Sequence, residues 1–142
     1  MISVRHIGIT VYDFDKMLSF YRDLLGFSHA KIALETGSYI DNFSALKDVE
    51  VTTAKLSNGS DGVMIELLKY HSHEGNSFSK EIINPGISHF ALTVDDLEEF
   101  YKKAVSEGVA FNAPPQHPPD GNALVTFCRD PEGNLIELVE VL

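Results

Sequence analysis

The sequence predicts an α+β fold built from two copies of one βαβββ module, in the order strand, helix, strand, strand, strand. A strand followed by an amphipathic helix occurs twice, strand pairs with turn signals follow each helix, and the two halves share sequence at matching places. We expect one domain of 142 residues, 1–142. The first module would span about residues 1–70 and the second about 87–142, with a loop of about 71–86 between them.

The first strand and helix of module one are marked by a change of hydrophobic period. Residues 4–11, VRHIGITV, are apolar and β-branched, which is typical of a strand. Asp13 is a suitable N-cap, and Gly26 stands where a glycine would end the helix. Between them, apolar residues recur at helical spacing and predict one buried face: Phe14, Met17, Leu18, Tyr21, Leu24 and Leu25.

The rest of module one is predicted to be sheet. Residues 49–56 and 62–70 have strand composition, and Asn58-Gly59 between them is a hairpin signal.

Module two repeats this order. Residues 87–94, ISHFALTV, predict a strand, and Asp95 or Asp96 would cap the following helix, which Gly108 ends. The inward face of that helix is expected to hold Leu97, Phe100, Tyr101, Ala104 and Val105.

The end of module two is again a pair of strands. Residues 122–129 and 133–141 are joined by the turn Asp130-Pro131-Glu132-Gly133, in which proline takes a favoured position. The proline-rich stretch 113–121 before them is expected to be a loop.

The repeat extends to single positions. HIGITVYD from His6 aligns with HFALTVDD from His89, and the IEL of residues 65–67 aligns with that of 136–138. The interval between the aligned His and Glu is longer in the first copy by about a dozen residues, which we place around 36–48. Internal duplication explains these matches.

Each copy carries a histidine in its first strand and a glutamate at the matching place of its last strand, namely His6 and Glu66, and His89 and Glu137. A carboxylate between isoleucine and leucine is costly to bury without a partner. Neighbouring strands lie ~4.8 Å apart, so a His and a Glu on adjacent strands can reach one metal ion. Two imidazoles and two carboxylates suit a borderline divalent cation. The alternative is that hydrogen-bonded histidines and solvent-facing glutamates repeat only through ancestry.

Together, the segments HIGITVYDFDKMLSFYRDLLGF, GVMIELL, GISHFALTVDDL and RDPEGNLIELVEV resemble the vicinal oxygen chelate superfamily. This superfamily includes glyoxalase I, methylmalonyl-CoA epimerase and the extradiol dioxygenases. The resemblance implies a curved mixed sheet around a metal-binding cup. It implies His6, Glu66, His89 and Glu137 as ligands of one divalent ion (Zn, Ni, Co, Mn or Fe), a small-molecule substrate and a homodimer.

The ligand types favour the proton-transfer branch of this superfamily, a lyase or isomerase of the glyoxalase I or methylmalonyl-CoA epimerase type. There the metal polarises a carbonyl, and Glu137 or Glu66 would remove the neighbouring proton, with Glu50 a further candidate base by its resemblance to the epimerases. Glyoxalases that bind glutathione carry an Arg where this chain has Thr10, which disfavours glutathione as the thiol.

Two other activities in the superfamily stay open. An extradiol-type ring-cleaving dioxygenase would use iron with two histidines and one glutamate, so Glu66 would not be a ligand. A non-catalytic small-molecule (antibiotic) binding protein shares the fold but often lacks the metal residues, whereas all four are present here.

Composition excludes several classes of partner. The net charge of −10 would be repelled by nucleic acid and by anionic membranes, and no apolar run approaches a membrane span. The first residues lack the pattern of a secretory leader, and Cys128 is the single cysteine, so a cytoplasmic protein without disulfides is expected. Cys128 itself is expected to be a buried structural thiol, and His117 a loop residue near the mouth of the cup.

Overall fold

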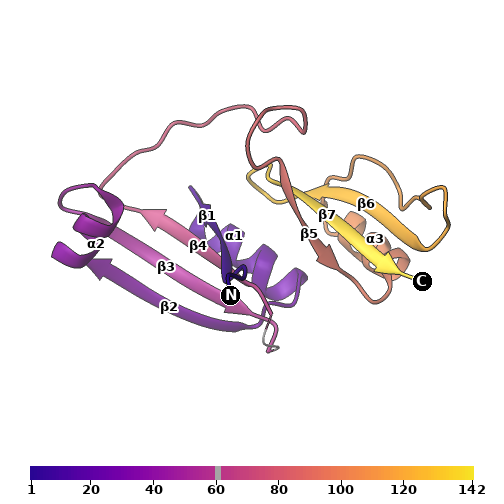
Figure 1. Cartoon of the computed structure of the whole chain (residues 1–142), viewed down its shortest axis with the longest axis horizontal. Helices are drawn as coiled ribbons and strands as arrows, with labels where there is room; N and C mark the ends of the chain where they lie inside the picture. Colours follow the sequence, from indigo (N-terminus) through magenta and orange to yellow (C-terminus); the bar gives the residue numbers. More distant parts are fainter. Residues whose placement is uncertain (60–61) are drawn as a thin grey trace. The chain divides into compact units, whose positions relative to one another are not determined.

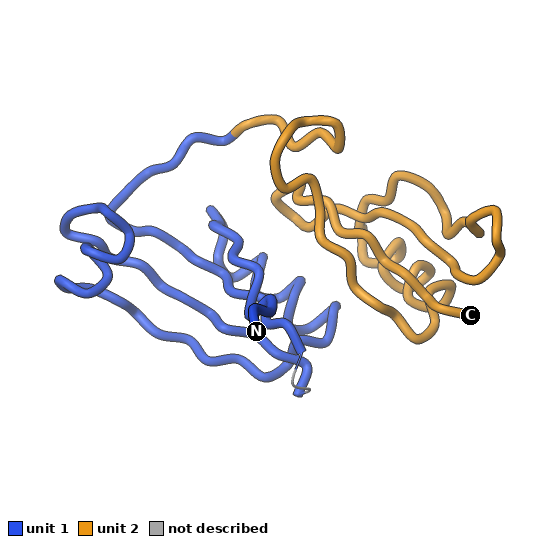
Figure 2. Tube along the Cα trace, in the orientation of Figure 1, with its two compact units in different colours: residues 1–77 blue, residues 78–142 orange. Residues whose placement is uncertain are grey.

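The computed structural model describes residues 1–59 and 62–142, which form two compact units, residues 1–77 and 78–142 (Figure 2). The division falls within the segment 71–86, where no helix or strand forms. Each unit has its own mixed sheet, so the predicted α+β class with a repeated module is confirmed.

Unit 1 (1–77) is a four-stranded sheet in the order β1-β4-β3-β2 (Figure 1). Its strands are β1 (His6–Thr10), β2 (His29–Thr36), β3 (Glu50–Ser57) and β4 (Met64–Tyr70). β1 runs parallel to β4, and the other neighbours are antiparallel. The hairpin signal Asn58-Gly59 is followed by residues 60 and 61, which lie outside the described residues, so that part of the prediction is not tested.

The helix of unit 1 packs on β4, as its apolar face predicts. It begins as α1 (Phe14–Ser19) and continues as the π-helical segment η1 (Phe20–Leu24). The Asp13 carboxylate accepts a hydrogen bond from the Lys16 N–H at 3.0 Å, and Gly26 follows the last turn with a φ of 82°. Both predicted boundary residues are therefore confirmed.

The extra residues of the first copy form α2 (Ser38–Ser44) in the predicted place, around 36–48. Ile40 of α2 packs on Val49 and Val51, with Leu68 and Tyr70 beside them. The insertion therefore covers one end of the sheet with a small apolar cluster of its own.

Unit 2 (78–142) is a three-stranded sheet in the order β5-β7-β6, with α3 (Leu97–Ser106) on one face (Figure 1). β5 (His89–Thr93) is parallel to β7 (Leu135–Val141), and β6 (Ala123–Arg129) is antiparallel to β7. Asp96 caps α3 by accepting from the Glu99 N–H at 2.8 Å, which decides between the two predicted caps. Gly108 ends the helix with a φ of 86°, as predicted.

The second strand of module two is reduced to two isolated bridges, Phe111 with Cys128 and Gln116 with Val125. Pro114 and Pro115 lie between these bridges and have no N–H to donate to a ladder. The expected full βαβββ order is thus complete in unit 1 only, and the loop predicted over 113–121 takes the place of the missing strand.

No helix among the described residues is long and apolar enough to cross a membrane.

Candidate metal centre

In unit 1, the parallel pairing of β1 with β4 brings His6 and Glu66 together. Gly8 lies opposite Glu66 and His6 lies opposite Met64, so both side chains project from the same face, offset by one pleat. His6 Nε2 is 3.1 Å from Glu66 Oε2. A histidine and a carboxylate therefore form a two-ligand pair within this unit.

Unit 2 forms the equivalent pair at the same register. Ala91 lies opposite Glu137 and His89 opposite Leu135, and His89 Nε2 is 3.4 Å from Glu137 Oε2. The His-to-Glu offset across the parallel strands is the same in both units. The sequence alignment of the two copies thus corresponds to a shared side-chain geometry.

A small residue stands directly opposite each glutamate, Gly8 in unit 1 and Ala91 in unit 2. Because neither side chain extends over the neighbouring strand, each carboxylate can reach back toward its histidine. The repeated histidines and glutamates do not by themselves point to these two positions. Their signal is a small residue two places after each repeated histidine.

Both pairs are shielded by the protein yet open to solvent on one side. The side chains of His6 and Glu66 are 38% and 13% exposed, and those of His89 and Glu137 are 32% and 26% exposed. The Ser88 hydroxyl lies 2.7 Å from His89 Nδ1. This contact orients the ring so that Nε2 faces the carboxylate, which is how outer-shell groups commonly hold a metal-binding histidine.

The two pairs differ in the residue across from each glutamate on the antiparallel side. Lys55 pairs with Glu66 in the ladder, and its Nζ lies 3.9 Å from Glu66 Oε1. Phe127 takes this place beside Glu137, and its ring meets the His89 ring edge-to-face with centroids 5.0 Å apart. Glu66 therefore has a cationic neighbour and Glu137 an aromatic one.

The donor chemistry of the pairs fits a divalent metal. Each unit offers one imidazole nitrogen and one carboxylate oxygen on neighbouring strands, and these are donor types that borderline dications bind. Across the described residues, 1–59 and 62–142, no group of three or more His, Cys, Asp or Glu side chains forms a metal cluster. The four predicted ligands lie as two pairs, one in each unit.

Glu50 does not join the His6–Glu66 pair of its own unit. It is the first residue of β3, whereas Lys55, nearer the other end of that strand, is the residue opposite Glu66. Strand alternation also places Glu50 and Lys55 on opposite faces of the sheet.

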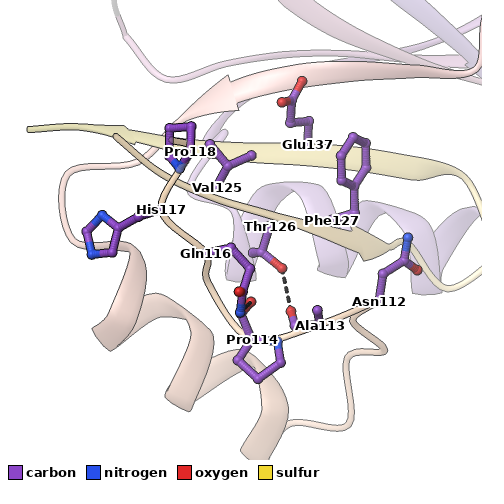
Figure 3. Close-up of a pocket in the computed structure, with 10 residues that line it drawn as sticks. All are labelled: Asn112, Ala113, Pro114, Gln116, His117, Pro118, Val125, Thr126, Phe127 and Glu137. Carbon is purple, nitrogen blue, oxygen red and sulfur yellow. Dashed lines mark hydrogen bonds between the residues drawn. The ribbon is translucent and has the colours of Figure 1, made fainter. Parts of the chain in front are cut away.

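A cavity of about 430 Å³ adjoins the pair of unit 2 (Figure 3). Its walls are the loop from Asn112 to Pro118, the β6 residues Val125 to Phe127, and Glu137 of β7. Figure 3 shows Glu137 and Phe127 projecting on the same side of the two strands. His117 also lies on this cavity, and its Nδ1 is 3.0 Å from the Ala123 carbonyl oxygen.

Cys128 is fully buried on the opposite face of β6. Burial, with a smaller contribution from the Asp130 charge, raises the pKa of the Cys128 thiol to about 12. A neutral, inaccessible thiol is not a nucleophile, which agrees with the predicted structural role.

Comparison with known proteins gives consistent results. The family model of the Glyoxalase/Bleomycin resistance protein/Dioxygenase superfamily matches residues 3–138. A probable lactoylglutathione lyase of Synechocystis is 30% identical over 137 residues, which is 95% of this chain and 92% of that protein.

Two solved structures share the fold. A glyoxalase family protein from Bacillus cereus superposes with a TM-score of 0.88 at 19% identity, over 100% of this chain and 95% of the other. The trypanothione-dependent glyoxalase I of Leishmania major superposes with a TM-score of 0.65 at 22% identity, over 99% and 87% of the two chains. At these identities the likeness concerns the fold.

Proposed function

Because the chain belongs to the Glyoxalase/Bleomycin resistance protein/Dioxygenase superfamily, we propose that it is a metal-dependent lyase or isomerase. The reaction would remove a proton α to a carbonyl group of a small substrate, in the manner of glyoxalase I or methylmalonyl-CoA epimerase. The observation that carries this proposal is the pair of His–Glu contacts at the same register in both units. A duplicated fold alone would not require the same polar pair twice on apolar strands.

The residues that would hold the metal are His6, Glu66, His89 and Glu137. When bound, a divalent ion would polarise the substrate carbonyl and so increase the acidity of the adjacent C–H. The superfamily generally binds such an ion, and the donor set of this chain matches its chemistry. We also propose a homodimer, as members of this family often form.

The base is proposed to be a glutamate of the ligand set. Glu137 is the stronger candidate because it lines the cavity of unit 2, where a substrate can approach its carboxylate. Glu66 is the alternative, but it is not among the residues that line this cavity, and Lys55 Nζ already lies 3.9 Å from its Oε1. Glu50 is not carried into this role because strand alternation places it on the opposite face of β3 from Lys55, the residue that pairs with Glu66.

The named relatives support a lyase more than the other activities of the superfamily. The Synechocystis relative is a probable lactoylglutathione lyase, and its similarity spans nearly all of both chains. However, Thr10 stands here where glutathione-binding glyoxalases carry an arginine. We therefore propose the reaction type and not glutathione as the thiol.

The first test is metal content and proton exchange. Full-length protein prepared without chelator should hold about one divalent ion per set of four ligands, and should catalyse deuterium exchange at the α-carbon of a carbonyl substrate in heavy water. Glu137→Gln, which keeps an oxygen ligand but loses the base, is expected to lower the exchange rate about 10²-fold or more while the metal is retained.

Glu98→Gln is the matched control, since this carboxylate is exposed on α3 and pairs only with Lys102. It should change neither metal content nor exchange. A chain that cannot be loaded with metal would refute the proposal, and oxygen uptake with catechols and ferrous iron would favour the dioxygenase instead.

A further inference from the structure

Glu137, the proposed base, lines the cavity of unit 2, and the chemistry of the other lining residues indicates which kind of substrate group the cavity can bind. Its volume of about 430 Å³ is in the range of small-molecule sites, which are mostly apolar with few polar groups. Among the described residues that line it, Glu137 is the only carboxylate and none is a lysine or arginine. A negatively charged group placed here would lie near the Glu137 carboxylate without a lysine or arginine to pair with.

The hydrogen-bonding groups of the wall are largely occupied within the protein. The Thr126 hydroxyl donates to the Ala113 carbonyl oxygen at 2.6 Å, as Figure 3 shows. The Gln116 side-chain amide donates to the carbonyl oxygens of Pro114 and Pro115 at 3.0 and 3.2 Å. These donors are therefore not free to bind a polar ligand.

What remains is a largely apolar surface with a few polar groups, namely the Asn112 amide, the second ring nitrogen of His117 and the side-chain carbonyl oxygen of Gln116. Val125, Phe127 and the prolines of the loop supply flat and branched carbon surface, and the Phe127 ring suits stacking with another ring. The Asn112 side chain is exposed at the edge of the cavity, and within the described chain its amide has no hydrogen-bond partner.

We propose that this cavity binds an uncharged aryl or branched-alkyl group of the substrate, next to the carbonyl carbon whose proton Glu137 removes. Asn112 would hydrogen-bond one neutral polar substituent of that group. The inference rests on the proposed function for the role of Glu137, but the chemistry of the cavity is independent of it. It assigns the substrate class as aryl or branched-alkyl carbonyl compounds, with no charge on the part that occupies the cavity.

The experiment compares two probes of the same shape, acetophenone and para-acetylbenzoate, by titrating the full ¹⁵N-labelled chain and following amide shifts. Acetophenone should shift the amides of Asn112, Ala113, Gln116, His117 and residues 125–127. It should bind at least about tenfold more tightly than para-acetylbenzoate, whose carboxylate would meet Glu137 and neither lysine nor arginine. Equal or tighter binding of para-acetylbenzoate, or shifts confined to other residues, would overturn the proposal.

Asn112→Lys supplies a cation at an exposed position and should improve para-acetylbenzoate binding several-fold while weakening that of acetophenone. Asn122→Lys is the matched control, because Asn122 is exposed and lies outside the cavity. It should leave both affinities unchanged. An identical response of the two variants would contradict binding in the cavity.

A further variant separates this inference from the proposed function. His6→Ala removes a proposed ligand in unit 1 and should abolish metal retention, yet acetophenone should still shift the cavity amides. If metal retention and proton exchange both fail in the unaltered chain while acetophenone occupies the cavity, the proposed reaction is wrong and the cavity assignment stands.

Discussion

At the scale of single residues, the space opposite each glutamate determines how the His–Glu pairs form. Gly8 and Ala91 occupy these places, and a Cβ added at Gly8 would meet the Leu68 Cδ1 at 3.6 Å, an ordinary van der Waals distance. One methyl group therefore fits, as unit 2 already shows with Ala91. A longer side chain would extend over the path between His6 and Glu66.

We expect Gly8→Ala to raise the free energy of unfolding by about 0.5 kcal/mol, because alanine restricts the unfolded chain more than glycine does. Gly8→Leu should weaken metal retention about tenfold or more by displacing the Glu66 carboxylate. Chemical denaturation and metal titration measure the two effects. Gly75→Leu is the control, since a Cβ there meets nothing within 4 Å. Unchanged metal affinity in Gly8→Leu would show that the small residue opposite Glu66 is not needed for metal binding.

Cys128 gives a pH-dependent prediction. Burial raises its pKa to about 12 in the folded chain, against the ordinary 9.0 of an exposed thiol, so above pH 9 the unfolded chain loses the thiol proton first. The thiol's contribution is complete below pH 9 and decreases as the pH rises toward 12, by about 1.4 kcal/mol per pH unit. Cys128→Ala should therefore lose stability less steeply over this range in denaturant titrations. If the free energies of unfolding of the unaltered chain and of Cys128→Ala fell in parallel with pH, the raised pKa of Cys128 would be contradicted.

At the scale of elements, side-chain oxygens at the starts of α1 and α3 accept hydrogen bonds from backbone N–H groups that have no partner within the helix. Asp13 caps α1, and Asp96 caps α3 by accepting from the Glu99 N–H. Glu140 of β7 adds a second acceptor for α3 by bonding the Leu97 N–H at 2.8 Å. This last contact joins the helix to the sheet strand that also carries Glu137.

Asp96→Ala should lower the free energy of unfolding by about 1 kcal/mol, because the Glu99 N–H loses its acceptor. Asp95→Ala is its matched control, since Asp95 is exposed and its side chain makes no hydrogen bond within the described residues. The free energies of unfolding of the two variants, measured by thermal or denaturant unfolding, should therefore differ by about 1 kcal/mol. A similar loss of stability in both variants would mean that the removed negative charge, and not the lost capping hydrogen bond, is responsible.

At the scale of the whole molecule, the donor set is divided equally between the two units. Each unit contributes one histidine and one glutamate to the proposed set, and two protein ligands are fewer than the three or four that metal centres normally use. Neither half is expected to hold the ion alone.

The double variants His6→Ala/Glu66→Ala and His89→Ala/Glu137→Ala should therefore both lose tightly bound metal, which elemental analysis after gel filtration will measure. Retention of metal by either one would refute a shared four-ligand site. Mixing the two variants then shows where the ligand set is completed. Recovered metal, one ion per two chains, would mean that two chains share each site, and no recovery would mean a site within one chain.

The α+β class, the duplication, the helix boundaries at Asp13, Gly26 and Gly108, and the two histidines and two glutamates that recur at matching places could all be predicted from the sequence alone. These follow from hydrophobic period, capping chemistry and repetition, which are properties of the local chain. The choice of Asp96 over Asp95 was left open because both are good caps at adjacent positions.

Only the tertiary structure decided which residues share a face and a neighbour. The register of β1 with β4 and of β5 with β7 brings each histidine next to its glutamate and places Gly8 and Ala91 opposite the glutamates. The register of β3 with β4 places Lys55, and not Glu50, opposite Glu66. Three features depend on segments that are distant in the chain. They are the strand register, the presence of Lys55 opposite Glu66 but Phe127 opposite Glu137, and the cavity beside Glu137. Local pattern does not encode such contacts, because strand pairing is fixed by how whole faces are buried together.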